Sequence, residues 1–443
     1  MNDDPYATPR TSPTETAAAA PLPPPHALSE SAQRRNSLVF LLNNSISYFV
    51  APVFYVGVLH AVVIERLGLS DTVANLPESV YMWMLPLPVF IAWLWPSTRH
   101  VKTMLVVNYA AKGLAGLAAV ALFLGAPTSW LAAGLIAHAG IVGVTTGVTN
   151  MCLWEVIGRG MTPARRGWTL GITFGIGPLF AVLGSCLSQL TLTGSFLGLM
   201  HMPKMPEPWG YVVLFGITAP AMALSAAFVS LVSLPAGAVE PRASLASMAG
   251  GLRQYFAHPP ILIALGGFLL TAAGGNMILA NLALYARDAT GHPPDEYAGW
   301  QLALRFGSKS VAGFLLGWLV ARLSPKMPAV ATTAFCLVGM LWALLVPGEW
   351  YLASFCFLGA GELFYVYYLN YIVGCSRPER MKENTAYTNV ISAAVGFVPL
   401  IYGGLSDRYG LRSSFVLAAG ILIAALALVT LLMPRRPKPP AVE

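Results

Sequence analysis

The chain has 443 residues, of which 56% are hydrophobic and only 10% are charged, and its formal net charge is +7. A soluble domain carries roughly 25% charged residues, so this composition excludes an ordinary water-covered protein and fits the hydrocarbon of a bilayer. No basic run is interleaved with aromatic residues. We therefore expect a lipid bilayer around the protein and no nucleic-acid partner.

The first 36 residues are polar and rich in Pro, Ala, Ser and Thr, and they predict a disordered cytoplasmic tail. A membrane span needs about 20 apolar residues. The apolar segments that meet this criterion are 37–64, 78–97, 101–124, 128–153, 167–192, 210–234, 259–286, 298–321, 328–347, 350–374, 385–405 and 413–433. The expected fold is an all-α membrane protein with twelve transmembrane helices.

The longest polar connection, residues 235–258, divides these spans into two groups of six. We predict two six-helix bundles, 37–234 and 259–433, with 235–258 as a cytoplasmic linker and 434–443 as a cytoplasmic tail. A short amphipathic helix is expected around Leu245–Phe256 in this linker.

The distribution of Lys and Arg predicts the orientation. With the N-terminus inside, the cytoplasmic regions hold 17 of these residues and the outer loops hold 5. Positive residues collect on the cytoplasmic side of membrane proteins, so both termini are expected in the cytoplasm, with the protein in the plasma (inner) membrane.

The two halves contain a repeat. IGRGMTPARRG, from Ile157, leads into GIGPLF, and VGCSRPERMKE, from Val373, leads into VGFVPL. Both stretches join the fourth and fifth spans of their half. Parallel repeats of this kind place a binding site at mid-membrane between the halves.

With this layout the chain resembles the major facilitator superfamily. The resemblance covers about 37–433 and rests on the six-plus-six layout, the basic loops TPARRG and RPERMKENTAYTN, and the Gly/Pro-rich fifth and eleventh spans. It implies a secondary transporter that works by alternating access. The family signature G-x-x-x-D-R-x-G-x-R is missing from the loop after the second span. It occurs instead from Gly403 to Arg412, in a loop expected outside.

Four charged residues are expected in the middle of spans: Lys112, Arg305, Lys309 and Glu362. A charge at the bilayer centre costs about 2.5–3.5 kcal/mol on insertion scales and usually faces a cavity. Arg305 and Lys309 are four residues apart and share a helical face with Gln301. We expect Glu362 to neutralise one cation and to couple transport to a proton; the alternative is a structural ion pair. Lys112 has either a substrate role or a packing role, against His138 or a carbonyl group.

Polar amides and tyrosines complete the expected substrate site, with hydrogen bonds between helices as the alternative role. These residues are Asn43, Asn44, Tyr48, Asn150, Asn276, Asn281 and Tyr365. Near the inner end of the fourth span, Glu155, Arg159, Arg165 and Arg166 are expected to form a cytoplasmic gate between the halves; the alternative is a solvated basic loop. Prolines, including Pro52, Pro86, Pro178 and Pro399, are expected to bend spans.

No phosphate-binding loop, metal-ligand cluster or catalytic motif is present in the sequence, so neither an enzyme nor a cofactor or metal is expected. The leading hypothesis is a monomeric secondary transporter of a small organic solute. Three buried cations against one acid favour an organic anion and proton coupling. A neutral solute such as a sugar, nucleoside or drug is the alternative, as is a non-transporting sensor or assembly protein.

Overall fold

The fold is that of a computed structural model, which describes residues 28–94, 100–196, 200–235, 245–376 and 380–437. Helices cover each of the twelve predicted spans, and several of them are built from two or three shorter helices. The first half contains α1 (Glu30–Phe49), α2 (Ala51–Phe54), α3 (Val56–Arg66), α4 (Asp71–Met84), α5 (Leu87–Leu94), α6 (Val101–Gly125), α7 (Thr128–Gly160), α8 (Pro163–Thr193), α9 (Trp209–Gly216) and α10 (Thr218–Ser230).

Two antiparallel strands of two residues each, β1 (Ser195–Phe196) and β2 (Met200–His201), follow α8. The short helix α11 (Leu245–Phe256) lies where the amphipathic helix was expected. The second half contains α12 (Pro259–Thr271), the π-helix η2 (Ala272–Asn276), α13 (Leu279–Leu284), α14 (Ala286–Thr290), the 3-10 helix η3 (Pro294–Glu296), α15 (Ala298–Arg322), α16 (Lys326–Leu345), the 3-10 helix η4 (Gly348–Leu352), α17 (Ala353–Gly361), α18 (Phe364–Gly374), α19 (Met381–Ser392), the 3-10 helix η6 (Ala393–Phe397), α20 (Val398–Tyr409) and α21 (Leu411–Leu431).

Nine helical stretches within the described residues are long and apolar enough to cross a membrane. The interrupted helices of the first two predicted spans and the charged helix α15 are not among these nine. The all-α membrane fold is therefore confirmed, whereas the count of twelve spans stays a prediction. The first helix also begins at Glu30, so the predicted tail boundary at residue 36 is too late. The part of the tail before Leu28 lies outside the described residues.

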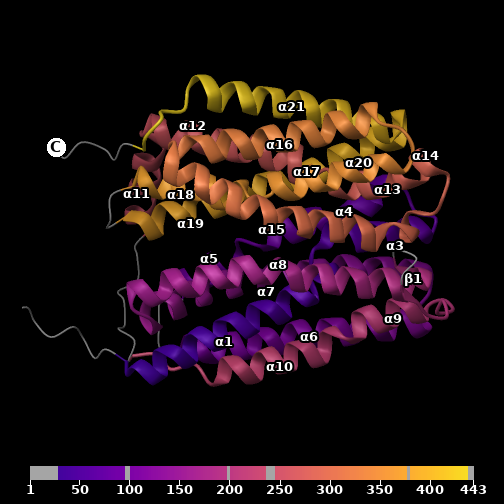
Figure 1. The fold of residues 1–443 in the computed structure, drawn as a ribbon, viewed down its shortest axis with the longest axis horizontal. Coiled ribbons are helices and arrows are strands. Elements are labelled where there is room, and N and C mark those ends of the chain that lie inside the picture. The colour runs from indigo at the N-terminus through magenta and orange to yellow at the C-terminus, as the bar shows by residue number, and fades with distance from the viewer. Residues whose placement is uncertain (1–27, 95–99, 197–199, 236–244, 377–379, 438–443) are drawn as a thin grey trace, which may run out of the picture.

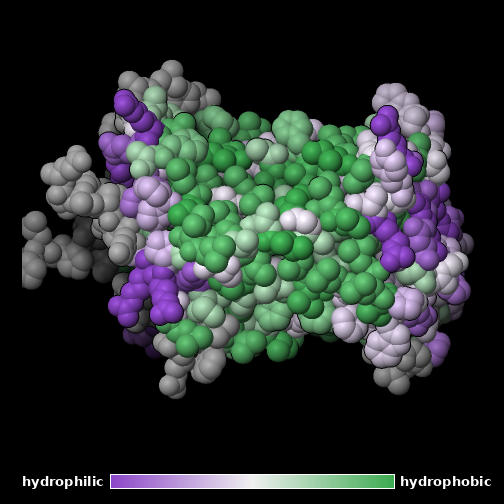
Figure 2. Space-filling view, turned by 90° about the horizontal axis from the view of Figure 1, so that it is seen from above, coloured by the Kyte–Doolittle hydropathy of each residue, from purple (hydrophilic) through white to green (hydrophobic). Residues whose placement is uncertain are grey.

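The helices run side by side along the long axis of the molecule (Figure 1). The start of α1 and the end of α21 lie at one end of the molecule, which we call the inner end, and β1 and α14 lie at the other, the outer end. In Figure 2 a broad apolar band separates two ends where hydrophilic residues gather. Phe314 and Leu345 belong to the exposed apolar residues, at 70% and 77% exposure. Such a surface is favourable only when lipid covers it.

The two halves meet along helix pairs that come from opposite parts of the sequence. Helix α8 packs against α15, and α4 packs against α20. Figure 1 shows α12–α21 gathered on one side of this contact and α1, α6, α9 and α10 on the other. The predicted domain boundary at 235–258 falls between these groups, but residues 236–244 lie outside the described part of the chain.

Prolines interrupt some of the spans, as predicted, but not all of them. The first span breaks around Pro52, where α1, α2 and α3 meet, and the second breaks around Pro86, between α4 and α5. Pro399 follows the 3-10 helix η6, which ends α19. By contrast α8 runs through Pro178 as one helix, so no break accompanies the Gly175–Pro178 pair. The two repeats therefore differ at this position.

Candidate central site

The centre of the molecule holds three charged side chains, Arg305, Lys309 and Glu362, which we call the charged triad. Glu362 lies at the junction of α17 and α18, and both cations lie on one face of α15. Arg305 Nε donates to Glu362 Oε2 at 2.9 Å, and Lys309 Nζ is 3.0 Å from Glu362 Oε1. Glu362 therefore binds both cations through its two oxygens, so neither cation is left without a partner in this conformation.

Burial makes this ion pair strong and makes its loss costly. The Arg305 and Glu362 side chains are 3% and 9% exposed. Two charges in a low-dielectric interior are tolerated when their geometry is good and their other polar atoms are bonded. Asn276, at the end of the π-helix η2, accepts a further bond from Arg305 Nη2 at 3.3 Å. A π-helix often occurs at functional sites, and here it turns an amide toward the triad.

Aromatic residues from the first half cover the triad. Tyr55 lies at the break between α2 and α3, and its ring centre is 5.4 Å from the Arg305 guanidinium carbon and 5.7 Å from Lys309 Nζ. Tyr48 and Tyr55 both contact Phe306 edge-on, at 6.5 and 5.0 Å between ring centres. Cations and aromatic rings attract each other at this range. The broken first span therefore brings the N-terminal half onto the charges of the C-terminal half.

A second buried acid, Glu78, also belongs to this centre. It lies on α4, it is 6% exposed, and it is close enough to Arg305 and Glu362 to interact electrostatically with both. The expectation that Glu362 is the only acid near the middle of a span is wrong. The reason is the register of the second span: α4 starts at Asp71, so Glu78 lies in its interior and not at its end.

Six of the residues predicted for the substrate site come together around the triad. Tyr365 contacts Phe268 edge-on, at 5.3 Å between ring centres, and lies near Glu78 and Glu362. With it, the structure places at this centre Tyr48, Asn276, Arg305, Lys309 and Glu362. Their role in binding stays a prediction, since a shared location is not evidence of a ligand.

Gln301 and Asn281 are placed away from the triad, contrary to expectation. The Gln301 amide donates to Ala283 O and to Tyr351 Oη, inside the C-terminal half. Asn281 lies at the outer end and accepts from Asn75 Nδ2 at 2.5 Å. Asn281 also donates to the hydroxyl groups of Ser406 and Ser414, and such bonds offset the cost of burying an amide.

The three asparagines of the first half also have other surroundings. Asn43 donates to Tyr109 Oη at 2.5 Å within the N-terminal half, and Asn44 donates to Phe40 O of its own helix at 2.9 Å. Asn150, on α7, is exposed. For Asn43 and Asn44 the hydrogen bonds fit the alternative reading, in which such residues link or stabilise helices.

Lys112 packs inside the N-terminal half. Its Nζ lies 5.5 Å from the Phe54 ring centre and 5.9 Å from that of Tyr109. His138, the expected neighbour, pairs with His60 through Nδ1 and Nε2 at 3.0 Å. These contacts fit the packing alternative for Lys112 and leave its substrate role without a contact to the triad.

The residues of the predicted cytoplasmic gate bind groups of the N-terminal half. Arg159 lies 3.8 Å from Glu155 and donates to Pro235 O at 2.7 Å. Arg165 lies 3.4 Å from Glu30, and Arg166 donates to Gly158 O at 3.0 Å. In this conformation these contacts hold α1, α7 and α8 together at the inner end. A gate between the halves stays a prediction.

A set of polar contacts between the halves lies at the outer end and was not predicted from the sequence. We call Asp71, Thr72, Arg287 and Asp407 the outer contact. Asp407 Oδ1 accepts from Asp71 N at 2.8 Å, and Asp407 Oδ2 accepts from Thr72 N at 3.1 Å and Thr72 Oγ1 at 2.5 Å. A carboxylate at a helix N-terminus is stabilised by the free N–H groups and the helix dipole.

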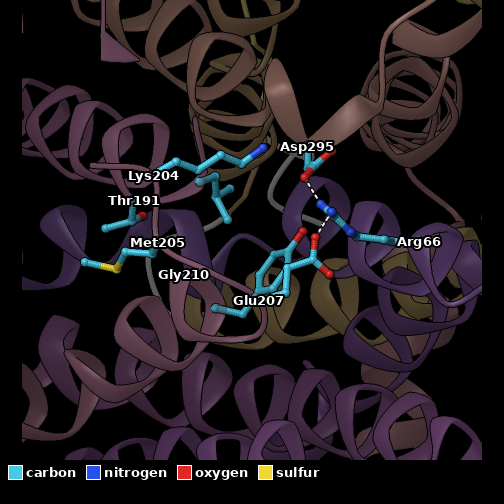
Figure 3. A pocket seen from close by; sticks show the side chains of 9 residues that line it. Arg66, Thr191, Lys204, Met205, Glu207, Gly210 and Asp295 are labelled. Atoms are coloured by element: carbon cyan, nitrogen blue, oxygen red, sulfur yellow. Dashed lines mark hydrogen bonds and ion pairs between the residues drawn. The ribbon is translucent and has the colours of Figure 1, made fainter. Parts of the chain in front are cut away.

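Arg287 adds the second arm of the outer contact. Its guanidinium lies 3.2 Å from Glu65 Oε1 and from Asp71 Oδ1. Burial alone would lower the pKa of Arg287, but the carboxylates of Asp71, Asp288 and Glu65 raise it, so the charge is retained. Nearby, Arg66 joins Glu207 of its own half to Asp295 of the other, at one edge of a small pocket that Lys204 also lines (Figure 3). The structure is therefore closed at this end.

Close backbone packing supports the same closure, and it gives a prediction. A Cβ added at Gly403 on α20 would lie 2.5 Å from Thr72 Cα on α4, whereas one added at the adjacent Gly404 would meet only Thr72 Oγ1, at 3.9 Å. We expect Gly403→Ala to destabilise this closed state by about 1–3 kcal/mol, the usual cost of overpacking. Gly404→Ala is the matched control.

The measurement is the rate at which a membrane-impermeant maleimide labels a cysteine at Ser406, a buried residue beside Asn281. Labelling should rise in Gly403→Ala and stay near the parent rate in Gly404→Ala. Equal labelling of both variants would show that this contact does not limit opening.

Residues 267–443 match the family model described as Major Facilitator Superfamily. No curated relative matches the chain. Among solved structures, a D-xylose-proton symporter superposes with a TM-score of 0.67 at 14% identity, over 91% of this chain and 98% of that one.

Two further solved structures have a similar fold. A bacterial homologue of the human lysosomal transporter Spinster, inward-facing and unoccupied, gives a TM-score of 0.62 at 16% identity over 91% of this chain and 97% of that one. A nucleoside transporter gives 0.65 at 10% identity over 89% and 99%. At these identities the likeness shows the fold alone.

Proposed function

We propose that the chain is a member of the major facilitator superfamily, whose model matches residues 267–443 and whose solved members share its fold, and that it moves a small organic solute across the membrane by alternating access. The observation that carries the proposal is the charged triad: three ionisable side chains are held at the contact between the two halves, under tyrosines of the opposite half. Buried charges in a membrane protein are expensive and usually functional.

The arrangement supports a polar solute with an apolar or aromatic part. Arg305 and Lys309 offer hydrogen-bond donors, and Tyr48, Tyr55 and Tyr365 offer ring faces. The expectation of an organic anion loses part of its basis, because Glu362 binds both cations in this conformation and leaves neither of them without a partner. An anionic group remains within the proposal, since it would replace Glu362 on one cation when the halves move.

A ligand screen tests the proposal. We expect one or more solutes from a library of organic anions and neutral compounds to raise the apparent melting temperature of the purified protein. A ligand at about 100 times its Kd stabilises the native state by about 2.7 kcal/mol. Arg305→Gln and Lys309→Gln should each weaken ligand affinity at least tenfold, because a hydrogen-bond donor is lost. The ligand-induced rise in melting temperature should become smaller accordingly.

The matched control is Lys326→Gln, which removes a lysine at the inner end whose Nζ donates to Thr430 O. It should keep the wild-type ligand response. A solute that stabilises all four proteins equally binds elsewhere, and this outcome would contradict the central site. A library without any stabilising solute would favour the sensor or assembly alternative.

A further inference from the structure

We propose that Glu78 is the proton-binding residue of the central site and that it competes with Glu362 for Arg305 when the two halves move. The inference rests on the proposed transport function and deepens it by naming the coupling ion and the group that carries it. Glu78 belongs to the N-terminal half and Glu362 to the C-terminal half, so the two acids move relative to one another in alternating access.

The first step is the packing of the Glu78 carboxyl group. Its Oε2 is buried and has no hydrogen-bond partner among the described residues. The carboxyl group lies directly against the backbone of α3, since a Cβ built at Gly57 would lie 2.5 Å from this oxygen. Pro77, the preceding residue, lies inside α4 and interrupts its hydrogen bonds. The carboxyl group is closely packed, and a proton can bind to it without any additional space.

The second step is the balance of charge. Glu362 already binds both cations of the triad, at 2.9 and 3.0 Å. An ionised carboxylate with an unpaired oxygen at this depth costs several kcal/mol, whereas the neutral acid does not. With Arg305 and Lys309 engaged, a proton on Glu78 supplies the missing neutralisation in this conformation.

The ionisable groups around Glu78 come from its own helix and from the helices packed against it. The charged groups that act on it are Arg305 and Glu362, and Tyr81 and Tyr365 lie near it. The helices packed on α4 are α3, α7, α13, η6 and α20. Their ionisable residues are His60, Glu65 and Arg66 on α3, His138, Cys152, Glu155 and Arg159 on α7, and Tyr402, Asp407, Arg408 and Tyr409 on α20. His60 and His138 bind each other, and Asp407 lies at the far end of α4.

The exchange balances in charge and protons. In the conformation described here, a neutral Glu78, an ionised Glu362 and two cations give the site a net charge of about +1. When the halves move, Arg305 leaves Glu362 Oε2 and pairs with Glu78, whose proton leaves to the solution on the open side. Glu362 keeps Lys309, and the site becomes neutral. No other reactant is needed.

Infrared difference spectroscopy of the protein reconstituted in lipid, between alkaline and mildly acidic buffer, tests the proposal without a solute. Wild type should gain the C=O stretch of a protonated carboxylic acid. This band should be lost in Glu78→Gln, whereas in Glu362→Gln it should remain but appear only at lower pH, because the two freed cations favour the ionised form of Glu78. Glu78→Asp should shift the band, and it serves if the glutamine variant folds poorly. Glu349→Gln, an exposed acid at the outer end, is the matched control.

A wild-type protein without the band, or a Glu78→Gln protein that keeps it unchanged, would overturn the inference. This result is separate from the transport proposal. A protein that shows the band but responds to no solute would carry a proton-binding Glu78 in a chain that does not transport. A protein that binds solute at the triad but lacks the band would be a transporter driven in another way.

Discussion

Replacing Glu362 by glutamine is expected to lower the free energy of unfolding by about 3–5 kcal/mol, the cost of breaking a buried ion pair from one side. Glu362 binds Arg305 and Lys309 at once, and both cations are buried. The variant leaves two positive charges without a carboxylate partner. The measurement is thermal unfolding of the purified protein, compared with Glu349→Gln, which removes an exposed acid that accepts from Tyr297 Oη.

The same experiment has an internal check. Adding Arg305→Gln and Lys309→Gln to the Glu362 variant should recover part of the lost stability, because no uncompensated charge remains. A loss below about 1 kcal/mol in the single variant, equal to that of an exposed ion pair, would show that water reaches the triad.

Asp407→Asn is expected to shift the protein toward a state that is open at the outer end. The carboxylate holds the N-terminus of α4 through two backbone N–H groups and the Thr72 hydroxyl. Such a cap contributes about 1 kcal/mol to the stability of the closed state. We expect no more than this because the Asp407 carboxylate is exposed to solvent. A change of that size alters a two-state ratio about fivefold.

Labelling of a cysteine at Ser406, in a background without the five native cysteines, measures this shift. The control is Glu349→Gln, which removes an exposed acid at the outer end whose hydrogen bond is to Tyr297 and not to the outer contact. Faster labelling in Asp407→Asn alone agrees with the outer contact. If both variants label at the same rate, surface charge and not the cap controls opening.

Much of the fold could be predicted from the sequence because a bilayer imposes long apolar helices and leaves few alternatives. The linker helix Leu245–Phe256 and the break at Pro52 were also foreseen. The repeat was less informative, since α8 continues through Pro178 while η6 precedes Pro399. Local hydrogen bonding, which the sequence pattern does not specify, decides whether a proline breaks a membrane helix.

The central site could be predicted only in part. The spacing of Arg305 and Lys309 identified one face of α15, and Glu362 was the right partner. Glu78 was missed because the second span was started at residue 78, which placed this acid at the membrane surface. A helix start signal was available: Ser70 accepts from Val73 N and caps α4.

The outer contact needed the three-dimensional structure. Asp407 was identified within the motif from Gly403 to Arg412, but its partner, the N-terminus of α4, lies more than 300 residues away in the sequence. Gln301 was misplaced for a related reason. A helical face shared with Arg305 does not fix the neighbour, and Gln301 faces Tyr351.

Alternating access between the two halves is the central claim, and distances between spin labels test it most directly. One pair would be placed at the outer end, on Lys204 and Tyr409, and one at the inner end, on Trp168 and Leu323; all four side chains are exposed. We expect Asp407→Asn, or a stabilising solute, to lengthen the outer distance and shorten the inner distance together. Distances that stay fixed, or that change in the same direction at both ends, would contradict transport by alternating access.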